Sequence, residues 1–351
     1  MKFPSAIFLI ISSWLVFLWT AAGVADGNEP STPNRLPAFS IMTWNLEWFF
    51  DESKQDNFSP LSHEKSAPSR GDWNWRRDAA AGVIAETQPS VVAMQEIEGQ
   101  RVMWYLSRAL VREHQLDYDE FVFQGNDHFT EQDVGLLVQA ETEVISVMRG
   151  NVTSRMKRTG EFGSVSKHVA AVIDVPVGDR IESILIVNLH LRSGEKNAAI
   201  RTKQAASLNE WIRRWSANNP NAHIIVLGDF NTEEVAGQIK PASELAVFQS
   251  RSTESRDDDL IDLHEHIHID DRQTHLLTGK QFDRILVSPS LVDDELGVLD
   301  LSLGSVSVRR DLVIRGKVDT ETEHWENYWQ SPESERDLSD HYPVFAEFVI
   351  R

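Results

Sequence analysis

The feature that most constrains this chain is a short apolar segment, residues 223–231, that ends abruptly in polar residues. It reads His-Ile-Ile-Val-Leu-Gly-Asp-Phe-Asn. A short, continuous apolar run rich in β-branched residues predicts a strand that is buried on both faces. Asp229 and Asn231 follow at its carboxyl end, where open α/β sheets place their sites. A carboxylate and an amide two residues apart suit Mg²⁺ and a water bound to phosphate.

Polar residues stand beside five other predicted strands in the same way. They are Asn45, Glu96, His190, Asp283 and the pair Asp340 and His341. A polar group against a buried strand is costly unless it is hydrogen-bonded or coordinated. Each one alone has a simpler explanation as a cap or turn residue. Six such positions in one chain indicate a shared site.

The remaining pattern predicts strands that alternate with helices in some places and follow one another directly in others. Apolar spacing predicts helices at 76–86, 99–114 and 197–216. Strands are expected at 38–50, 90–95, 121–124, 169–175, 181–190, 282–287 and 342–350, and the strands 134–139 and 144–147 are expected to pair with each other. Residues 51–71 are expected to form a polar loop. This order predicts mixed sheets flanked by helices.

The composition is that of a globular protein with an acidic surface. The chain has 351 residues, of which 41% are hydrophobic and 25% charged, and this is ample for a large core. A formal net charge of −20 repels nucleic acid on average, so tight binding without catalysis is disfavoured as a function. An enzyme can still act on a polyanion where a divalent metal and a few local cations make its active face positive.

The N-terminal segment differs from the rest in being almost uncharged. Lys2 precedes an apolar run over 6–22, and Gly23 and Ala25 supply the small residues of a cleavage site. This pattern predicts a secretory signal peptide at 1–25, a flexible spacer at 26–37 and one domain at 38–351. An uncleaved N-terminal anchor is the alternative. A chain without cysteine fits a secreted or periplasmic bacterial protein, because animal secreted proteins commonly carry disulfides.

Six short motifs resemble those of the endonuclease/exonuclease/phosphatase superfamily and occur in that family's order. They are TWNLEW at 43–48, MQE at 94–96, NLHL at 188–191, GDFN at 228–231, FDRI at 282–285 and SDHYPV at 339–344. One motif of this length is weak, but six in order across nearly the whole domain are specific. The last two are similar to deoxyribonuclease I in particular. The resemblance implies an α/β (α+β) four-layer sandwich, with two packed mixed β-sheets flanked by helices.

The same resemblance implies a metal site at one end of the sandwich. Glu96 would be the main ligand of Mg²⁺, with Asn45 beside it. Asp340 would complete the group that binds metal or water. Mn²⁺ and Ca²⁺ remain alternatives to Mg²⁺, since all three ions accept carboxylate and amide oxygens.

The resemblance also implies the catalytic residues. Asp229 and Asn231 would orient the attacking water and the scissile phosphate. His190 and His341 would flank the phosphate, and Asp283 would fix the tautomer of His341. Together they would support in-line attack of water on a phosphodiester bond, assisted by the metal. The expected function is a secreted, metal-dependent nuclease that acts on DNA or RNA as a monomer, with no stable protein partner.

One departure from the family pattern affects this expectation, and a second counts against an alternative to it. In deoxyribonuclease I a glutamate pairs with the first histidine, whereas the position that aligns here is Gln132, and Glu131 or Asp133 would have to replace it. Thr232 and Glu233 follow Asn231, so the arginine of the inositol-polyphosphate phosphatases is missing there. The alternatives are a phosphatase or phospholipase of the inositol phosphate or sphingomyelin type, and a scaffold that has lost catalysis.

Three further groups of residues allow more than one interpretation. His264, His266, His268 and Asp270 occupy alternate positions and form either a second metal site on one strand face or a solvated segment, which is preferred. Trp325, Tyr328 and Trp329 either stack on bases or, preferably, pack within their own loop. Basic side chains that follow His190 are candidate phosphate contacts: Arg192, Arg201 and Lys203.

Overall fold

The computed structural model describes residues 38–149, 165, 167–249, 259–293 and 299–351. The predicted signal peptide and spacer lie outside the described residues. Among the helices that are described, none combines the length and the apolar character needed to cross a membrane.

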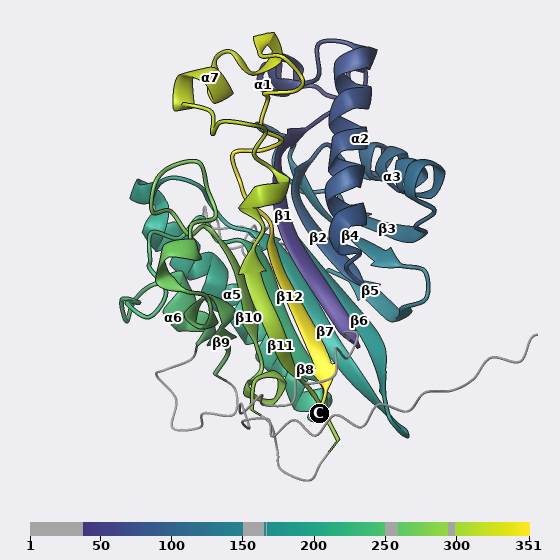
Figure 1. Ribbon diagram of the computed structural model, residues 1–351. Helices are drawn as coiled ribbons and strands as arrows, with labels where there is room; N and C mark the ends of the chain where they lie inside the picture. Colours follow the sequence, from purple (N-terminus) through teal and green to yellow (C-terminus); the bar gives the residue numbers. More distant parts are fainter. Residues whose placement is uncertain (1–37, 150–164, 166, 250–258, 294–298) are drawn as a thin grey trace, which may run out of the picture. The chain divides into compact units, whose positions relative to one another are not determined.

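Two six-stranded sheets form the framework (Figure 1). The first has the order β11-β12-β1-β2-β4-β3 and the second the order β5-β6-β7-β8-β10-β9. Each sheet has one parallel pair near its centre, β1 with β2 and β7 with β8, and its other pairs are antiparallel. The strands of the first sheet are β1 (Phe39–Phe49), β2 (Val91–Ile97), β3 (Tyr118–Phe123), β4 (Asp133–Gln139), β11 (Leu301–Val308) and β12 (Val344–Ile350). Those of the second are β5 (Glu143–Met148), β6 (His168–Val177), β7 (Arg180–His190), β8 (His223–Asp229), β9 (Ile261–Asp262) and β10 (Asp283–Val287).

The main core lies between the two sheets. Alternate residues of each strand point to opposite faces, so Ile41 of β1 and Ile225 of β8 enter this core, whereas Met42 and Ile224 face outward. Both faces of the central strands are apolar because both are covered. This explains why segment 223–229 is a continuous apolar run rather than an alternating one.

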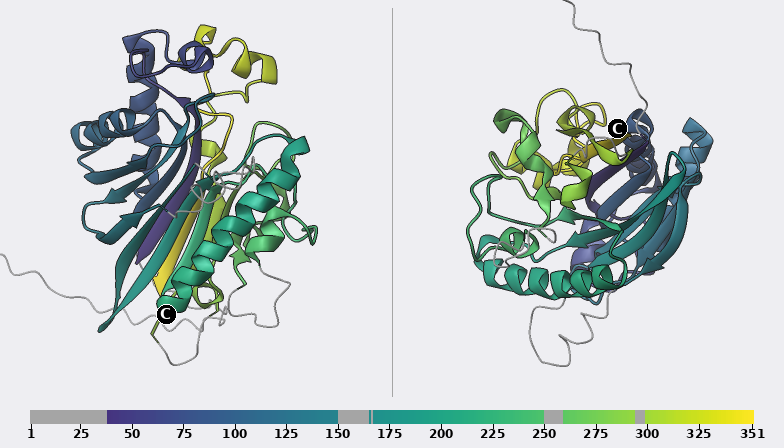
Figure 2. Two further views of the ribbon diagram at one scale, coloured as in Figure 1. Left: turned by 180° about the vertical axis from the view of Figure 1, so that it is seen from behind. Right: turned by 90° about the horizontal axis from the view of Figure 1, so that it is seen from below.

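Helices cover the outer face of each sheet (Figure 2). Residues of α2 (Arg70–Thr87) and α3 (Gln100–Ala109), which continues as a π-helical turn at Leu110–His114, pack on the first sheet. Residues of α5 (Ala198–Asn218) and α6 (Glu244–Phe248) pack on the second. Two short helices, α1 (Pro60–Lys65) and α7 (Glu321–Trp325), lie at the end where β1 terminates (Figure 1). The predicted four-layer sandwich of two mixed sheets flanked by helices is confirmed.

The structure corrects two local predictions and adds one strand. The strands at 134–139 and 144–147 do not pair with each other, because β4 lies between β2 and β3 in the first sheet while β5 pairs with β6 in the second. Strand β11 was not predicted, since its sequence is rich in serine and glycine. The polar segment 51–71 is not all loop, because it contains α1 and ends where Ser69 caps α2.

Asn188, near the end of β7, joins the two sheets through buried hydrogen bonds. Its Nδ2 donates to the carbonyl oxygens of Met94 (2.9 Å) and Gly135 (2.8 Å), and its Oδ1 accepts a bond of 2.7 Å from Gln95. This amide therefore holds the carboxyl ends of β2 and β7 together, next to the predicted site.

The variant Asn188→Leu is expected to lower the free energy of unfolding by about 3 kcal/mol, because it leaves buried polar groups of the first sheet without partners. Urea unfolding measures the loss. Asn218→Leu, at the exposed end of α5, is the matched control and should change stability little. Equal midpoints for the two variants would contradict the assigned role of Asn188.

Candidate active site

The predicted site residues come together at one end of the sandwich, where the two central parallel pairs have their carboxyl ends. Opposite His190 of β7 lies Asp229 of β8, and Asp229 in turn pairs with Asp283 of β10. Asn45 of β1 reaches across the sandwich, because its Nδ2 donates to Asp229 Oδ2 at 2.9 Å. All eight predicted residues contribute to this cluster: Asn45, Glu96, His190, Asp229, Asn231, Asp283, Asp340 and His341.

Glu96 projects from a break in the register between β2 and β4. Its backbone has φ 58°, a left-handed conformation that is uncommon for a residue other than glycine and that redirects the side chain. The carboxylate accepts bonds from the Trp48 backbone, the Gln132 side chain and Asn45 Nδ2. Burial, together with the charge of Asp340, raises the pKa of Glu96 to about 7. A group in this state is stabilised by a bound cation.

Asp229 is nearly fully buried and is held from several sides. Its Oδ1 accepts the Asn231 backbone N–H at 2.7 Å, and its Oδ2 accepts Asn231 Nδ2 at 3.1 Å. Burial raises the pKa of Asp229 to about 6. Glycine is required at position 228, because a Cβ there would lie 2.0 Å from the Leu189 carbonyl oxygen and φ is 133°. The close approach at Gly228 brings the ends of β7 and β8 together.

The side chain of Asn45 does not have the orientation expected of a metal ligand, because its oxygen faces away from Glu96. Its Oδ1 accepts the backbone N–H of Glu47 at 2.9 Å, so it is Nδ2 that faces Glu96 and Asp229. In this position the amide separates two carboxylates by donating to both. Its oxygen would face a metal at Glu96 only after the side chain turned.

The predicted hydrogen bond between Asp283 and His341 is present. His341 Nδ1 lies 2.8 Å from Asp283 Oδ2, and this directs Nε2 toward Asp229 Oδ2 (3.9 Å) and Asp340 Oδ1 (3.8 Å). Burial alone would lower the pKa of His341, but the charges of Asp283 and Asp340 raise it well above its usual value. The neighbouring carboxylates therefore favour the charged form of the His341 imidazole.

His190 has a different environment. Its Nε2 lies 3.5 Å from Asp229 Oδ2 and 3.8 Å from Glu96 Oε1, whereas its buried Nδ1 has no hydrogen-bond partner among the described residues. Burial lowers the pKa of His190 well below its usual value. Among the described residues, neither candidate replacement for the family glutamate forms a hydrogen bond or ion pair with His190. Glu131 accepts backbone N–H groups of residues 58 and 59, and Asp133 accepts that of residue 125.

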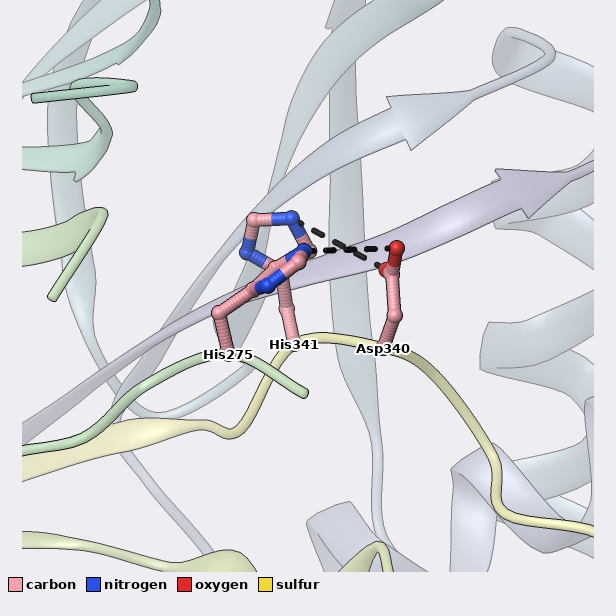
Figure 3. A group of neighbouring side chains, drawn as sticks. All are labelled: His275, Asp340 and His341. Atoms are coloured by element: carbon pink, nitrogen blue, oxygen red, sulfur yellow. Dashed lines mark ion pairs between the residues drawn. The ribbon is translucent and has the colours of Figure 1, made fainter. Parts of the chain in front are cut away.

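His275, which was not predicted, lies beside His341 (Figure 3). The two rings meet edge to face with centroids 4.6 Å apart, and His275 Nε2 lies 3.4 Å from Asp340 Oδ2. The Leu277 backbone donates to His275 Nδ1 at 3.0 Å, so the ring proton is on Nε2, toward Asp340. Only the β-bridge between residues 275 and 341 brings this side chain into the site, and local sequence gives no sign of it.

The segment around α7 also reaches the site. Trp325 Nε1 donates to Asp340 Oδ2 at 3.0 Å, so this ring does not pack within its own loop as expected. The expectation does hold for Tyr328 and Trp329, whose centroids lie 4.9 Å apart. His324 contacts Glu47 and thereby joins α7 to the end of β1.

A cavity of about 410 Å³ opens on the strand ends. Its lining includes Trp48, Glu96, Gln132, Lys167, His190 and Arg192. Lys167 is largely buried and lies 3.0 Å from Asp127, Thr130 and Gln132, whereas Arg192 is exposed. Of the other basic residues proposed to contact phosphate, Arg201 is buried against Glu244 and cannot do so.

Asp127 holds Lys167 in this cavity. Burial alone would raise the pKa of Asp127, but the charge of Lys167 and bonds from Thr130 hold it well below its usual value. A carboxyl group whose pKa falls on folding contributes stability above its unfolded pKa of about 4, and this contribution is lost as pH decreases.

The variant Asp127→Asn is therefore expected to have a free energy of unfolding about 1.5 kcal/mol lower than the parent protein near pH 7. The difference should narrow at about pH 3, as measured by urea unfolding. A difference that is the same at both pH values would contradict this account.

The donor set fits a divalent cation. Glu96, His190 and Asp229 present ligand atoms that all lie within 4.8 Å of one another. Asp340 Oδ1 is buried without a hydrogen-bond partner among the described residues, as expected of an oxygen that receives a cation instead. Carboxylate oxygens are the preferred ligands of Mg²⁺. The alternative site at 264–270 has no such geometry, because His264 is buried while His266 and His268 are exposed on successive 3₁₀ turns.

Comparison with known proteins agrees with this arrangement. The sequence model of the Endonuclease/Exonuclease/phosphatase family matches residues 40–349. Humanized D. rerio TDP2 superimposes with a TM-score of 0.54 at 15% identity, covering 88% of this chain and 98% of its own. The human Nocturnin catalytic domain superimposes with a TM-score of 0.54 at 15% identity, covering 90% of this chain and 96% of its own. The Bacteroides thetaiotaomicron mannosyl-6-phosphatase superimposes with a TM-score of 0.54 at 17% identity, covering 89% of this chain and 99% of its own.

A structure of D. rerio TDP2 in complex with a single-strand DNA product also superimposes, with a TM-score of 0.53 at 15% identity, covering 88% of this chain and 98% of its own. No curated protein sequence matches the chain significantly. The structural matches, at 15–17% identity, show only a shared fold. The family model shows more, because it matches the sequence over the whole sandwich, including the strand ends that carry the site. The chain therefore belongs to the endonuclease/exonuclease/phosphatase family and is a phosphoester hydrolase with a candidate metal site.

Proposed function

We propose that this protein is a metal-dependent nuclease that hydrolyses phosphodiester bonds of DNA or RNA. The observation that carries the proposal is the pairing of His341 with Asp283 beside Asp229, which Asn45 links to Glu96. This arrangement brings together an imidazole whose charged form is favoured, a buried carboxylate of raised pKa and a carboxylate suited to a metal, and the last of these, Glu96, also lines the cavity. In-line hydrolysis of a phosphoester needs these three functions.

Each residue has a role that follows from its contacts. Asp229 and Asn231 orient the attacking water, and Asp229 accepts its proton. His341 donates a hydrogen bond from Nε2 to a phosphate oxygen, since Asp283 occupies its Nδ1. His190 stays neutral and packs against the phosphate from the other side. Mg²⁺ held by Glu96 and Asp340 would polarise the phosphoryl oxygen.

The charge of the cavity favours a diester over a monoester. A monoester is a dianion near neutral pH, whereas each phosphate of a nucleic acid carries one negative charge. In the described lining the cations are Lys167 and Arg192, and Lys167 is already matched by Asp127. Glu233, where the inositol-polyphosphate phosphatases carry arginine, forms an ion pair with Lys280. Apart from His341 and a bound metal, the described lining therefore adds little positive charge for a dianion.

Two further observations bear on the substrate. D. rerio TDP2, which shares this fold, has been crystallised with a single-strand DNA product, and this supports a nucleic-acid substrate here. Trp48, which is partly exposed, lines the cavity and can stack on a base. The structural likeness to a mannosyl-6-phosphatase keeps a phosphatase, or a phospholipase, as the alternative. We also propose, from the N-terminal sequence alone, that the protein is secreted or periplasmic.

Incubation of the purified protein with supercoiled plasmid tests the proposal. Nicking is expected with Mg²⁺ or Mn²⁺ and is expected to stop with EDTA. The variant Asp229→Ala should not nick, whereas Asp270→Ala, an exposed residue outside the site, should nick like the parent protein. If neither ion supports nicking, the nuclease proposal fails, and inositol phosphates and sphingomyelin become the substrates to test.

A further inference from the structure

Gln132, at the position that aligns with a glutamate of deoxyribonuclease I, is hydrogen-bonded at both ends of its amide. The residue is buried, with 4% of its surface exposed. Its Nε2 donates to Glu96 Oε2 at 2.5 Å, and its Oε1 accepts from Lys167 Nζ at 3.0 Å. An ionised glutamate at this position could accept from Lys167 but could not donate to Glu96. The glutamine is therefore what allows both bonds.

The ammonium group of Lys167 fixes the orientation of this amide. Its three N–H donors have three acceptors, each at 3.0 Å: Asp127 Oδ2, Thr130 Oγ1 and Gln132 Oε1. Because an ammonium group only donates, the oxygen of Gln132 must face Lys167, and the nitrogen must face Glu96. Lys167 lines the cavity, but its donors are engaged within the protein rather than directed at a substrate.

The two sheets together place Lys167 and Gln132 side by side. Lys167 precedes β6 of the second sheet, and its backbone carbonyl accepts the N–H of His190 at 3.0 Å. Gln132 precedes β4 of the first sheet. The bond between the two side chains therefore links the sheets at the end that carries the candidate metal ligands.

These contacts give the two oxygens of Glu96 different environments. Oε2 accepts from Gln132 and from the Trp48 backbone N–H, the latter at 3.2 Å. Oε1 lies 3.8 Å from Nε2 of His190, which belongs to the same group of potential metal ligands. With Oε2 held from two directions, the carboxylate has a fixed orientation that turns Oε1 toward this group.

We propose that Gln132, oriented by Lys167, is a positioning residue that prepares Glu96 to bind the divalent cation. Hydrogen bonds to a ligating carboxylate fix its geometry, and their loss commonly weakens metal binding by about tenfold to a hundredfold. Lys167 acts through Gln132 and not through its charge, since a positive charge near the site would by itself repel a cation. The inference rests on the metal site proposed at Glu96, but it does not depend on which phosphoester is the substrate.

Titration calorimetry of the full chain with MnCl₂ tests this proposal. The variant Glu96→Gln identifies the binding that belongs to the Glu96 site. Gln132→Met keeps a similar length and the same net charge, and it should weaken Mn²⁺ binding at that site by about tenfold to a hundredfold. Gln139→Met, the same substitution at the opposite end of β4, is the matched control and should bind Mn²⁺ like the parent protein.

A double-mutant cycle tests whether Lys167 acts through Gln132. Lys167→Met alone should weaken Mn²⁺ binding by about tenfold, although it removes a positive charge from the cavity. Added to Gln132→Met, it should change the affinity by less than about twofold. Urea unfolding of the same preparations shows whether each variant is folded under the conditions of the titration.

Three results would overturn the positioning role while leaving the metal site intact. They are parent-like affinity in Gln132→Met, tighter Mn²⁺ binding in Lys167→Met, and an equal effect of Lys167→Met with and without Gln132. If the parent protein shows no Mn²⁺ binding that Glu96→Gln removes, the metal site itself fails, and this inference fails with it.

Discussion

The variant His341→Ala is expected to turn over its phosphoester substrate about a thousandfold more slowly than the parent protein. His341 Nε2 faces the buried carboxylates of Asp229 and Asp340, and Asp283 holds the ring in that orientation. Alanine removes both the proton donor and the positive charge that stabilises the phosphate. The measurement is kcat on an oligonucleotide substrate at saturating Mg²⁺.

Two controls distinguish this loss from a folding defect. His223→Ala removes a histidine that contacts Glu182 and Ser290 at the start of β8, at the opposite end from Asp229, and it should leave kcat unchanged. Asp283→Asn keeps His341 but removes its charged partner, so it should lower kcat by about a hundredfold and alter the pH profile. Activity of His341→Ala within about tenfold of the parent would refute the assigned role.

The variant Glu96→Gln is expected to lose about a thousandfold in turnover and to require far more metal for the activity that remains. Burial and the neighbouring Asp340 charge oppose ionisation of Glu96, so a metal bound there would stabilise its carboxylate. Glutamine keeps the size and one oxygen but removes the charge. Turnover measured across a series of Mg²⁺ concentrations reports both effects.

Glu98→Gln is the matched control, because Glu98 lies two residues further along. Its carboxylate accepts bonds from the Asp51 backbone and the Asn57 side chain. This variant should lose stability but keep the metal dependence of the parent protein. A similar change in metal requirement in both variants would mean that Glu96 does not hold the metal.

Much of the fold could be predicted from sequence, because it depends on local patterns. Central strands covered on both faces are continuous apolar runs, so 223–229 was predicted correctly. The polar residues that follow these runs share one end of the sandwich because the strands that carry them are the central parallel pairs. For the same reason Asn45, Glu96, His190 and Asp229 could be predicted to lie together. The family match confirms the resemblance that the six motifs indicated.

The parts that sequence did not reveal depend on contacts between distant segments. Strands β4 and β5 are neighbours in sequence but join different sheets, and no local pattern distinguishes this from a hairpin. His275 enters the site through a bridge to His341, and His324 through a bond to Glu47, 277 residues earlier in the chain. Gln132 lines the same cavity as His190, but its side chain donates to Glu96 and accepts from Lys167. Such pairings are decided by packing rather than by spacing along the chain.

The proposal that this family member acts on nucleic acid is tested most directly by comparing two substrates with one protein preparation. The kcat/KM for a dinucleotide phosphodiester is measured beside that for the corresponding nucleoside monophosphate, with Mg²⁺ and with Mn²⁺. Beyond His341 and the metal, the cavity lining adds little positive charge for a dianion, so the diester is expected to be preferred by about a hundredfold or more. Equal or faster hydrolysis of the monoester would contradict the nuclease assignment and favour a phosphatase.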